Sequence, residues 1–299
     1  MTTPLLSIII PTHNRPHLLP RAVESALAQT LESIEVIVVD DASTEPVQLP
    51  DHPRLRVIRL ETSHGGAGAR NVGTAAAQGR WVTYLDDDDR LLPHMAALSL
   101  AALEQATVPP PIAVISGIEV VNPQGKMVKV RLPPSLSPKG ANFSLEELEA
   151  GRSYNTKQTM VVERVVIQQM GGWDAAFRSR VHTELFLRLN QVCSIVGLAT
   201  ATYQLYEHAE VRVSSNLSLR RDSFRQLVTK HDALFRAHPH RFAELVYEHG
   251  LILFRAGQYK DALASLCWAI QINPGRALYR FCASCWQTLD DYVLTALRA

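Results

Sequence analysis

The stretch Trp81–Asp89 reads Trp-Val-Thr-Tyr-Leu-Asp-Asp-Asp-Asp, and the predicted fold of the first part of the chain is built around it. Its first four residues are β-formers, and Leu85 ends an apolar run that is too short for a helix. Four carboxylates follow, with no lysine or arginine among them. Because adjacent like charges repel and Mg²⁺ and Mn²⁺ prefer hard oxygen ligands, the run is a candidate cation site. The alternative is a solvated acidic turn that caps a helix beginning near Leu91.

Short apolar runs before residue 90 predict the strands of a mostly parallel sheet. They are rich in β-branched residues and cover Leu5–Ile10, Ile34–Val39, Leu55–Leu60 and Trp81–Leu85. Helical spacing between the first two runs predicts a helix that continues to Gln29. An alanine-rich helix is expected from Gly65, with Gly79 as its C-cap. This order of elements is typical of an α/β fold.

Polar residues follow three of these strands, at Thr12 to Arg15, at Asp40-Asp41 and at Asp86 to Asp89. The carboxyl ends of parallel strands meet at one edge of a sheet, where open α/β sheets bind ligands. We therefore expect a nucleotide at this rim. The glycines between Gly65 and Gly68 lack the spacing of a dinucleotide fingerprint, so NAD is discounted. They either allow close backbone approach or contact a phosphate.

The middle of the chain continues the α/β pattern. Ile112–Val121 predicts a strand, and the turn signal that follows it predicts a hairpin with Lys126–Leu132. Residues 133–160 are punctuated by proline and glycine, and we expect a loop-rich region there. Helices are predicted over Glu163–Met170 and from His182, and a last strand is predicted over Leu198–Tyr206.

The rest of the chain, from Leu217, has helical periodicity. Within it, Arg241–Asn273 predicts two helices joined by a turn and resembles a single tetratricopeptide repeat. One repeat cannot bury its own apolar face, so flanking helices should pack on it. The alternative is a helical tail that only supports the sheet.

The composition of the 299 residues is that of a globular protein, with 46% hydrophobic and 20% charged residues. The net charge of +1 gives no reason to expect nucleic acid as a partner. No signal peptide and no apolar stretch of membrane-spanning length are visible. The four cysteines are sparse; Cys282 and Cys285 form a CxxC with no second pair and are expected to be buried thiols, and a reducing cytoplasm is the expected compartment.

Four motifs together resemble the family 2 glycosyltransferases of the GT-A fold. They are Ser7-Ile-Ile-Ile-Pro-Thr-His-Asn-Arg, Val38-Val-Asp-Asp-Ala-Ser, Gly68-Ala-Arg-Asn-Val-Gly and Tyr84-Leu-Asp-Asp-Asp-Asp. Fainter similarities follow at Gly171-Gly-Trp-Asp, Glu184-Leu-Phe-Leu-Arg-Leu and Tyr206-Glu-His. The resemblance implies a GT-A domain over residues 1–215, with a nucleotide-binding half to about 110 and an acceptor half after it. Residues 216–299 form the helical region outside it.

The resemblance also implies a nucleotide-sugar donor, most often a UDP-sugar, and a divalent cation, Mn²⁺ or Mg²⁺. The acceptor would be a saccharide, a lipid-linked molecule or a protein. The residues carried over to the nucleotide are Pro11, Thr12, Asn14, Asp41, Arg70, Asp86 and Asp87. Of these, Asp41 would accept the imide N–H of the base. Asp88 is carried over as the metal ligand, and His208 lies where relatives have a histidine near the diphosphate or metal. A lone surface histidine is the alternative for His208.

The sequence departs from the family pattern at the catalytic base. Inverting members carry an acidic pair where this chain has Val181 and His182. A histidine can act as a general base at neutral pH, and Glu184 is the competing candidate. A histidine that only caps the helix is the structural alternative.

Three functions remain open from the sequence. The first is an inverting, metal-dependent glycosyltransferase of cell-surface polysaccharide or glycoconjugate synthesis, cytoplasmic or peripheral on the inner face of the membrane. The second is a catalytically weak or inactive sugar-nucleotide-binding module whose C-terminal helices recruit a protein partner or the membrane. The third is a nucleotidyltransferase, against which the lack of a glycine-rich basic loop after the first strand counts.

Overall fold

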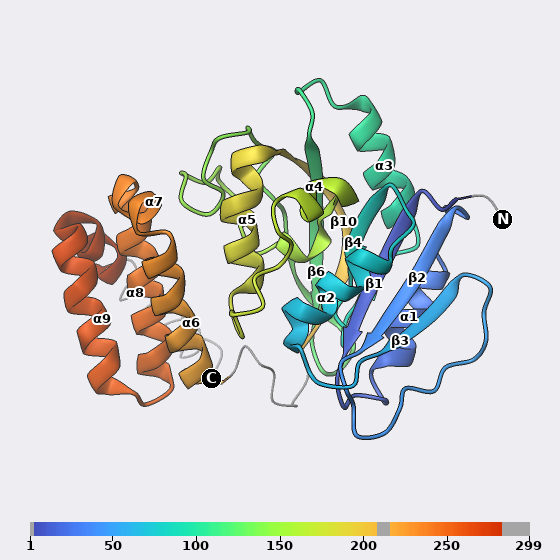
Figure 1. Cartoon of the computed structure of the whole chain (residues 1–299). Helices are drawn as coiled ribbons and strands as arrows, with labels where there is room; N and C mark the ends of the chain where they lie inside the picture. The colour runs from blue at the N-terminus through green and yellow to red at the C-terminus, as the bar shows by residue number, and fades with distance from the viewer. Residues whose placement is uncertain (1–2, 208–215, 283–299) are drawn as a thin grey trace, which may run out of the picture. The chain divides into compact units, whose positions relative to one another are not determined.

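The computed structural model of the protein describes residues 3–207 and 216–282. Contacts divide the chain into two compact units, one with strands β1 to β10 and helices α1 to α5, the other with helices α6 to α9. Figure 1 shows the twisted sheet of the first unit and the helices of the second. The further division of the first unit into a nucleotide half and an acceptor half stays a prediction.

The sheet of the first unit has the order β3-β2-β1-β4-β9-β6-β10-β5, with β7 beside β6 and β8 beside β10. Its strands are β1 (Leu6–Thr12), β2 (Ile34–Asp40), β3 (Leu55–Arg59), β4 (Trp81–Tyr84), β5 (Arg90–Leu91), β6 (Ile112–Val121), β7 (Met127–Arg131), β8 (Leu136–Ser137), β9 (Val161–Glu163) and β10 (Ser194–Tyr206). The first four strands in this order run parallel, and β9 is antiparallel to both β4 and β6. The carboxyl ends of β4 and β6 therefore face the same edge, and the mainly parallel sheet confirms the predicted α/β fold.

Helices cover both faces of this sheet (Figure 1). They are α1 (Leu19–Leu27), α2 (Gly65–Ala76), α3 (Met95–Gln105), α4 (Arg164–Gln169) and α5 (Val181–Val192), with a 3₁₀ turn, η1 (Lys157–Thr159). Alternate residues of β1 show the two layers, because Ile8 and Ile10 pack with α1 and α3 while Ile9 packs with α2, α4 and α5. This is the period of two that a strand buried on both faces requires.

The strand β1 extends beyond its neighbour β4, and this places the site. Its pairing with β4 ends at Ile9 and Tyr84, whereas its pairing with β2 continues to Thr12. Pro11 is tolerated in this central strand because it lies past the β4 ladder and its missing N–H breaks no bond on that side. The residues after Tyr84 therefore turn alongside the last residues of β1.

Two predicted boundaries are wrong. No helix begins near Leu91, because Arg90-Leu91 forms the short strand β5 against β10, and α3 starts at Met95 after Pro93. Gly79 is not the C-cap of α2, which ends at Ala76. It is instead a point of close approach, since a Cβ at Gly79 would lie 2.7 Å from the main-chain nitrogen of Ser7.

The second unit is a set of antiparallel helices and confirms the predicted helical C-terminal region. They are α6 (Leu217–Lys230), α7 (Asp232–Ala237), α8 (Pro239–Arg255) and α9 (Tyr259–Ile272). The pair α8 and α9 is the helix–turn–helix expected over Arg241–Asn273, and Gly257 supplies its turn with a φ of +75°. Inside the unit, Glu244 is buried and pairs with Arg241 and Arg276.

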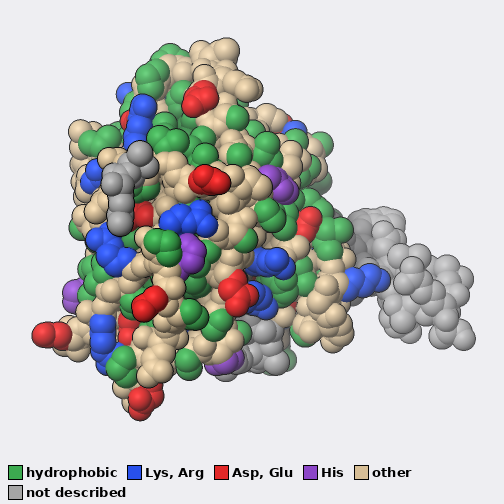
Figure 2. All heavy atoms as spheres, turned by 90° about the vertical axis from the view of Figure 1, so that its right-hand side faces the viewer, with side chains coloured by type: hydrophobic (Ala, Val, Ile, Leu, Met, Phe, Trp, Pro, Cys, Tyr) green, Lys and Arg blue, Asp and Glu red, His purple; other side chains and the backbone are tan. Residues whose placement is uncertain are grey.

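The surface charge, the apolar character of the helices and the exposure of the cysteines can also be described. Acidic and basic side chains are interspersed on the face shown in Figure 2. Across residues 3–207 and 216–282, no helix has the length and apolar character to cross a membrane. Cys193 is buried, whereas Cys267 and Cys282 are exposed on the helical unit, so the expectation of a buried thiol is wrong for Cys282. The fourth, Cys285, lies outside the described residues.

Candidate active site

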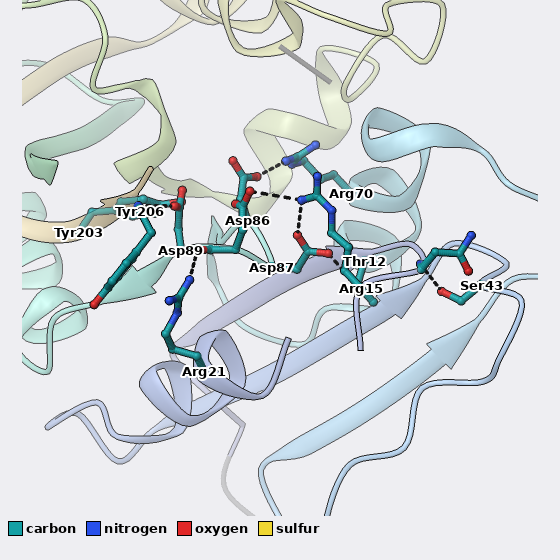
Figure 3. A network of polar contacts seen from close by, with 12 residues as sticks. Thr12, Arg15, Arg21, Ser43, Arg70, Asp86, Asp87, Asp89, Tyr203 and Tyr206 are labelled. Carbon is teal, nitrogen blue, oxygen red and sulfur yellow. Dashed lines mark hydrogen bonds and ion pairs between the residues drawn. The ribbon is translucent and has the colours of Figure 1, made fainter. Parts of the chain in front are cut away.

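The acidic run after β4 forms a tight turn at the rim of the sheet (Figure 3). The N–H of Asp89 donates to the carbonyl oxygen of Asp86 at 3.1 Å, which closes the turn. Asp86, Asp88 and Asp89 each bring one carboxylate oxygen within 4.8 Å of the others. Asp87 points elsewhere, since its two oxygens accept from Thr12 and Arg15. We call residues 86–89 the acidic turn.

Thr12 joins the acidic turn to the loop after β2. Its hydroxyl donates to Asp87 Oδ2 at 2.7 Å, while its carbonyl oxygen accepts from the N–H of Asp41 at 2.9 Å. Asn14 extends the same connection, because its N–H donates to the Ser43 hydroxyl at 2.9 Å. Its backbone takes the left-handed conformation, with a φ of +55°. Pro11 is buried beside these residues.

Asp41 lies at this rim but already has three donors. Its carboxylate oxygens accept from the Ser63 hydroxyl at 2.7 Å and from the N–H groups of His64 and Gly65 at 2.7 and 2.9 Å. Asp41 therefore stabilises the N-terminus of α2, where free N–H groups favour a negative charge. A carboxylate has about four lone-pair sites, so one more donor can still be accepted.

Arginines from outside the acidic turn partly neutralise it. Arg15 Nη1 lies 3.0 Å from Asp87 and 3.2 Å from Asp88, and Arg70 on α2 pairs with Asp86. The run contains no lysine or arginine of its own, so these basic partners come from elsewhere in the chain. Arg15 comes from the loop after β1 and Arg70 from the helix before β4, so only the folded chain brings them to it.

Asp89 is held by two residues of strand β10. Its two oxygens accept from the Tyr203 hydroxyl at 2.8 Å and from the N–H of Tyr206 at 2.9 Å, both on β10. Burial and the neighbouring charges of Asp88 and Asp86 raise the pKa of Asp89 well above its usual value. Burial likewise raises the pKa of Asp87. A positive charge placed among these carboxylates would favour their ionised forms.

The aromatic side chain of Trp173 brings His182 to the same region. Arg70 lies over the Trp173 ring with its guanidinium carbon 5.1 Å from the ring centroid, and the His182 ring packs on Trp173 edge-on at 5.0 Å. His182 is in the first turn of α5. Burial, followed by the charge of Arg70, lowers its pKa to about 3. His182 is therefore neutral at physiological pH and has a free lone pair on one ring nitrogen.

Glu184 is in a different environment. It is buried, and its oxygens accept from Nε and Nη2 of Arg188 at 2.7 and 2.6 Å. Arg188 in turn donates to the carbonyl oxygens of Met170 and Gly172, both at 2.9 Å. Glu184 is thus part of a contact that ties α5 to the loop after α4. His208, the other predicted ligand, lies outside the described residues.

Sequence reasoning missed several residues of the site. Local sequence gives no signal for Arg21 or Tyr203, which contact Asp88 and Asp89, and it places Arg15 and Asp89 at the rim without individual roles. Tyr206 and the Gly-Gly-Trp-Asp motif carry only a faint similarity to the family in the sequence. The position of Tyr206 at the end of a predicted strand is the signal that points to it. Strand β10 is parallel to β6, so it ends at the same edge of the sheet as β6.

Comparisons with known proteins agree with this geometry. Residues 7–147 match the sequence model described as glycosyl transferase family 2. The matched segment covers just under half of the chain. The four motifs that carried the resemblance all lie inside it, including the acidic turn and Arg70.

Relatives and solved structures extend the likeness. An uncharacterized glycosyltransferase of Haemophilus influenzae is 33% identical over 193 residues, which is 62% of each chain. The succinoglycan biosynthesis protein ExoO of Rhizobium meliloti is 34% identical over 132 residues, or 42% of this chain and 37% of that protein. The chain thus spans less than two thirds of either relative. The crystal structure of Staphylococcus aureus TarS 1–349 in complex with UDP-GlcNAc is also similar to this chain, with a TM-score of 0.61 and 19% sequence identity. The match covers 91% of this chain and 82% of TarS 1–349. This similarity confirms the GT-A fold.

Proposed function

We propose that this protein is a glycosyltransferase that moves a sugar from a nucleotide-sugar donor to a saccharide, lipid-linked or protein acceptor. The observation that carries the proposal is the convergence of three carboxylates of the acidic turn, within 4.8 Å of one another, on the rim of a family 2 domain. The relative ExoO, described as a succinoglycan biosynthesis protein, favours a role in the synthesis of a polysaccharide or glycoconjugate.

The nucleotide is proposed to lie along the rim between Asp41 and Asp86. Pro11, Thr12 and Asn14 would border the base, and Asp41 would accept its imide N–H. Asp86 or Asp87 would contact the ribose, and Arg70 the phosphates. The crystal structures of TarS with UDP and with UDP-GlcNAc support a UDP-sugar as the donor.

A divalent cation fits the acidic turn, because its carboxylates supply the hard oxygen ligands that Mn²⁺ and Mg²⁺ prefer. Asp88 is the proposed principal ligand, with Asp86 beside it and His208 as a further candidate. Asp89 is held by two donors from β10, and it would orient the turn or add an oxygen. When bound, such a cation stabilises the negative charge that grows on the leaving diphosphate.

His182 is the better candidate for the base that deprotonates the acceptor hydroxyl. It is neutral and lies within the Arg70–Trp173 cluster, whereas both oxygens of Glu184 already accept from Arg188. Bringing a diphosphate beside Arg70 would offset the positive charge that lowers the pKa of His182 and would make it a stronger base. An inverting outcome is proposed on the family resemblance.

A second candidate function is a sugar-nucleotide-binding module with little or no transfer. The low pKa of His182 favours it, because a base that binds protons this weakly gives little rate enhancement. The two candidates differ in one measurable respect: the module binds UDP without turning over any donor.

Hydrolysis of a panel of nucleotide sugars, with Mn²⁺ or Mg²⁺, tests the proposal in parallel with UDP binding. We expect cation-dependent hydrolysis of a UDP-sugar, and Asp88→Asn should lower it by about a hundredfold and weaken UDP binding. His182→Gln should lower transfer at least about a hundredfold with UDP binding kept. The control is Asp51→Asn, an exposed acid away from the turn. Full turnover in Asp88→Asn would refute the assignment, and UDP binding without turnover in the unmodified chain would favour the module.

A further inference from the structure

Arg21 contacts the acidic turn through the backbone and pairs with none of its carboxylates. It lies on α1, and its Nη2 donates to the main-chain carbonyl oxygen of Asp88 (Figure 3). Its guanidinium carbon lies 3.8 Å from the centroid of the Tyr206 ring. Its buried Nε has no hydrogen-bond partner among the residues that the structure describes. A cation placed here only to neutralise acids would be expected to reach a carboxylate, as Arg15 and Arg70 do.

Tyr206 connects the same guanidinium to the other end of the turn. Its ring stacks on Arg21, and its N–H donates to Asp89 Oδ1 at 2.9 Å. Tyr203, also on β10, holds Asp89 Oδ2 at 2.8 Å. The turn is therefore fixed from two sides, by α1 at the carbonyl of Asp88 and by β10 at the carboxylate of Asp89.

The peptide bond between Asp88 and Asp89 explains why a contact to a carbonyl matters. That bond is planar, so fixing the carbonyl of Asp88 fixes the plane that links the two residues. Both Cα atoms lie in that plane, and together with the hydrogen bond from the Asp89 N–H to the Asp86 carbonyl oxygen this limits the directions of their Cα–Cβ bonds. The side-chain oxygens that converge within 4.8 Å depend on those directions.

We propose that Arg21 is a positioning residue for the cation-binding carboxylates. It orients Asp88 by holding its carbonyl oxygen and by packing against Tyr206, and it does not touch the donor or the cation itself. This inference rests on the proposed function, in which the acidic turn binds a divalent cation.

Substitution by lysine separates positioning from charge. A lysine keeps the positive charge near the turn, but it lacks the planar fork that stacks on a ring while donating to a carbonyl. If Arg21 acted only by its charge, Arg21→Lys would behave like the unmodified protein. If it acts by position, Arg21→Lys and Tyr206→Ala should share one defect, whereas Tyr206→Phe keeps the ring and should not.

The experiment measures Mn²⁺ binding to the full chain by electron paramagnetic resonance, with and without UDP, and needs no turnover. Groups that orient metal ligands typically contribute ten- to a hundredfold to metal affinity, so Arg21→Lys and Tyr206→Ala should each raise the Kd for Mn²⁺ by about tenfold. Tyr206→Phe and Arg54→Lys should change it by less than about twofold. Arg54 is the matched control, since it also donates to a main-chain carbonyl, that of Leu27 at 2.7 Å.

The outcomes are distinct. Unchanged Mn²⁺ affinity in Arg21→Lys, with its melting temperature kept in metal-free buffer, overturns the inference and leaves the proposed function standing. If that variant does not fold, the Tyr206→Ala and Tyr206→Phe pair decides, because equal affinities in the two also overturn it. An unmodified chain that binds neither Mn²⁺ nor UDP would refute the proposed function, and the inference with it.

Discussion

Arg15 Nη1 lies 3.0 Å from Oδ1 of Asp87, and this ion pair joins the loop after β1 to the acidic turn after β4. The two residues are 72 positions apart in the chain. The same nitrogen lies 3.2 Å from Asp88, so one guanidinium is shared by two adjacent carboxylates. The acidic turn is therefore partly neutralised by the protein, and a bound cation would add to or replace that charge.

Loss of Arg15 should make the protein depend on a cation for stability. Arg15→Gln removes the positive charge that two buried carboxylates share, so we expect a loss of about 1 kcal/mol in the free energy of unfolding without metal. Added Mn²⁺ should then raise the melting temperature of Arg15→Gln more than that of the unmodified protein. Thermal denaturation with and without Mn²⁺ measures both effects. If Mn²⁺ raised the melting temperatures of Arg15→Gln and of the unmodified protein equally, that result would contradict cation binding at this turn.

The pKa of His182 predicts an unusual pH dependence. A base that is protonated only near pH 3 stays neutral as the pH falls through 6.5. If His182 is the base, the acidic limb of kcat/KM, which reports the free enzyme, should lie well below pH 6.5. A limb near 6.5 that disappears in His182→Gln would show instead that the histidine is exposed to solvent and titrates normally.

The same pKa makes a separate prediction about stability. The unfolded chain binds a proton at His182 below about pH 6.5 and the folded chain does not, so the free energy of unfolding should fall as the pH drops from 6.5 toward 4. In His182→Gln this contribution is absent, and its melting temperature should fall less over that range. Thermal melts of the two proteins at pH 7 and pH 5 test it, and parallel losses would refute it.

Glu184 is expected to matter for stability more than for the rate of transfer. Glu184→Gln would leave Arg188 charged and half-buried with its main acceptor weakened, and breaking such a pair typically costs about 3 kcal/mol. We expect a lower midpoint of urea denaturation, with kcat changed by less than about threefold. Glu149→Gln, an exposed acid that pairs with Arg152, is the control. A large fall in kcat at unchanged stability would restore Glu184 as the base.

Substitution of Asp41 should lower both the stability of the protein and its affinity for UDP. Asp41→Asn replaces one carboxylate oxygen with an N–H₂ group that cannot accept from Ser63, His64 or Gly65, so the N-terminus of α2 should lose about 1 kcal/mol. If Asp41 also accepts from the base, UDP affinity should fall about tenfold, and the preference for UDP over other nucleoside diphosphates should narrow. Calorimetric titration with UDP, CDP and ADP measures this. A loss of stability with unchanged nucleotide preference would assign Asp41 to the helix alone.

Most of the sheet could be predicted from local sequence because burial on both faces needs continuous apolar runs. The segments Ile34–Val39 and Ile112–Val121 match β2 and β6 to within a residue. The start of α3 could not be predicted in the same way, because Arg90-Leu91 is a strand only through its pairing with β10, more than a hundred residues later. The C-cap predicted at Gly79 is wrong for a similar reason, since the close approach that requires glycine there involves Ser7 of another strand.

What the sequence determined by itself is the position of the acidic turn at the end of a buried strand, and with it the rim where Thr12, Asp41 and Asp86 lie. A strand end is encoded by a change from apolar to polar residues over a few positions, which is local information. Which cations neutralise the turn, and which side chains orient it, was decided only by the tertiary structure. Arg15, Arg21 and Tyr206 reach the turn from elements 60 or more residues away in the chain. Their charge and ring contacts depend on distances in space that no local pattern records.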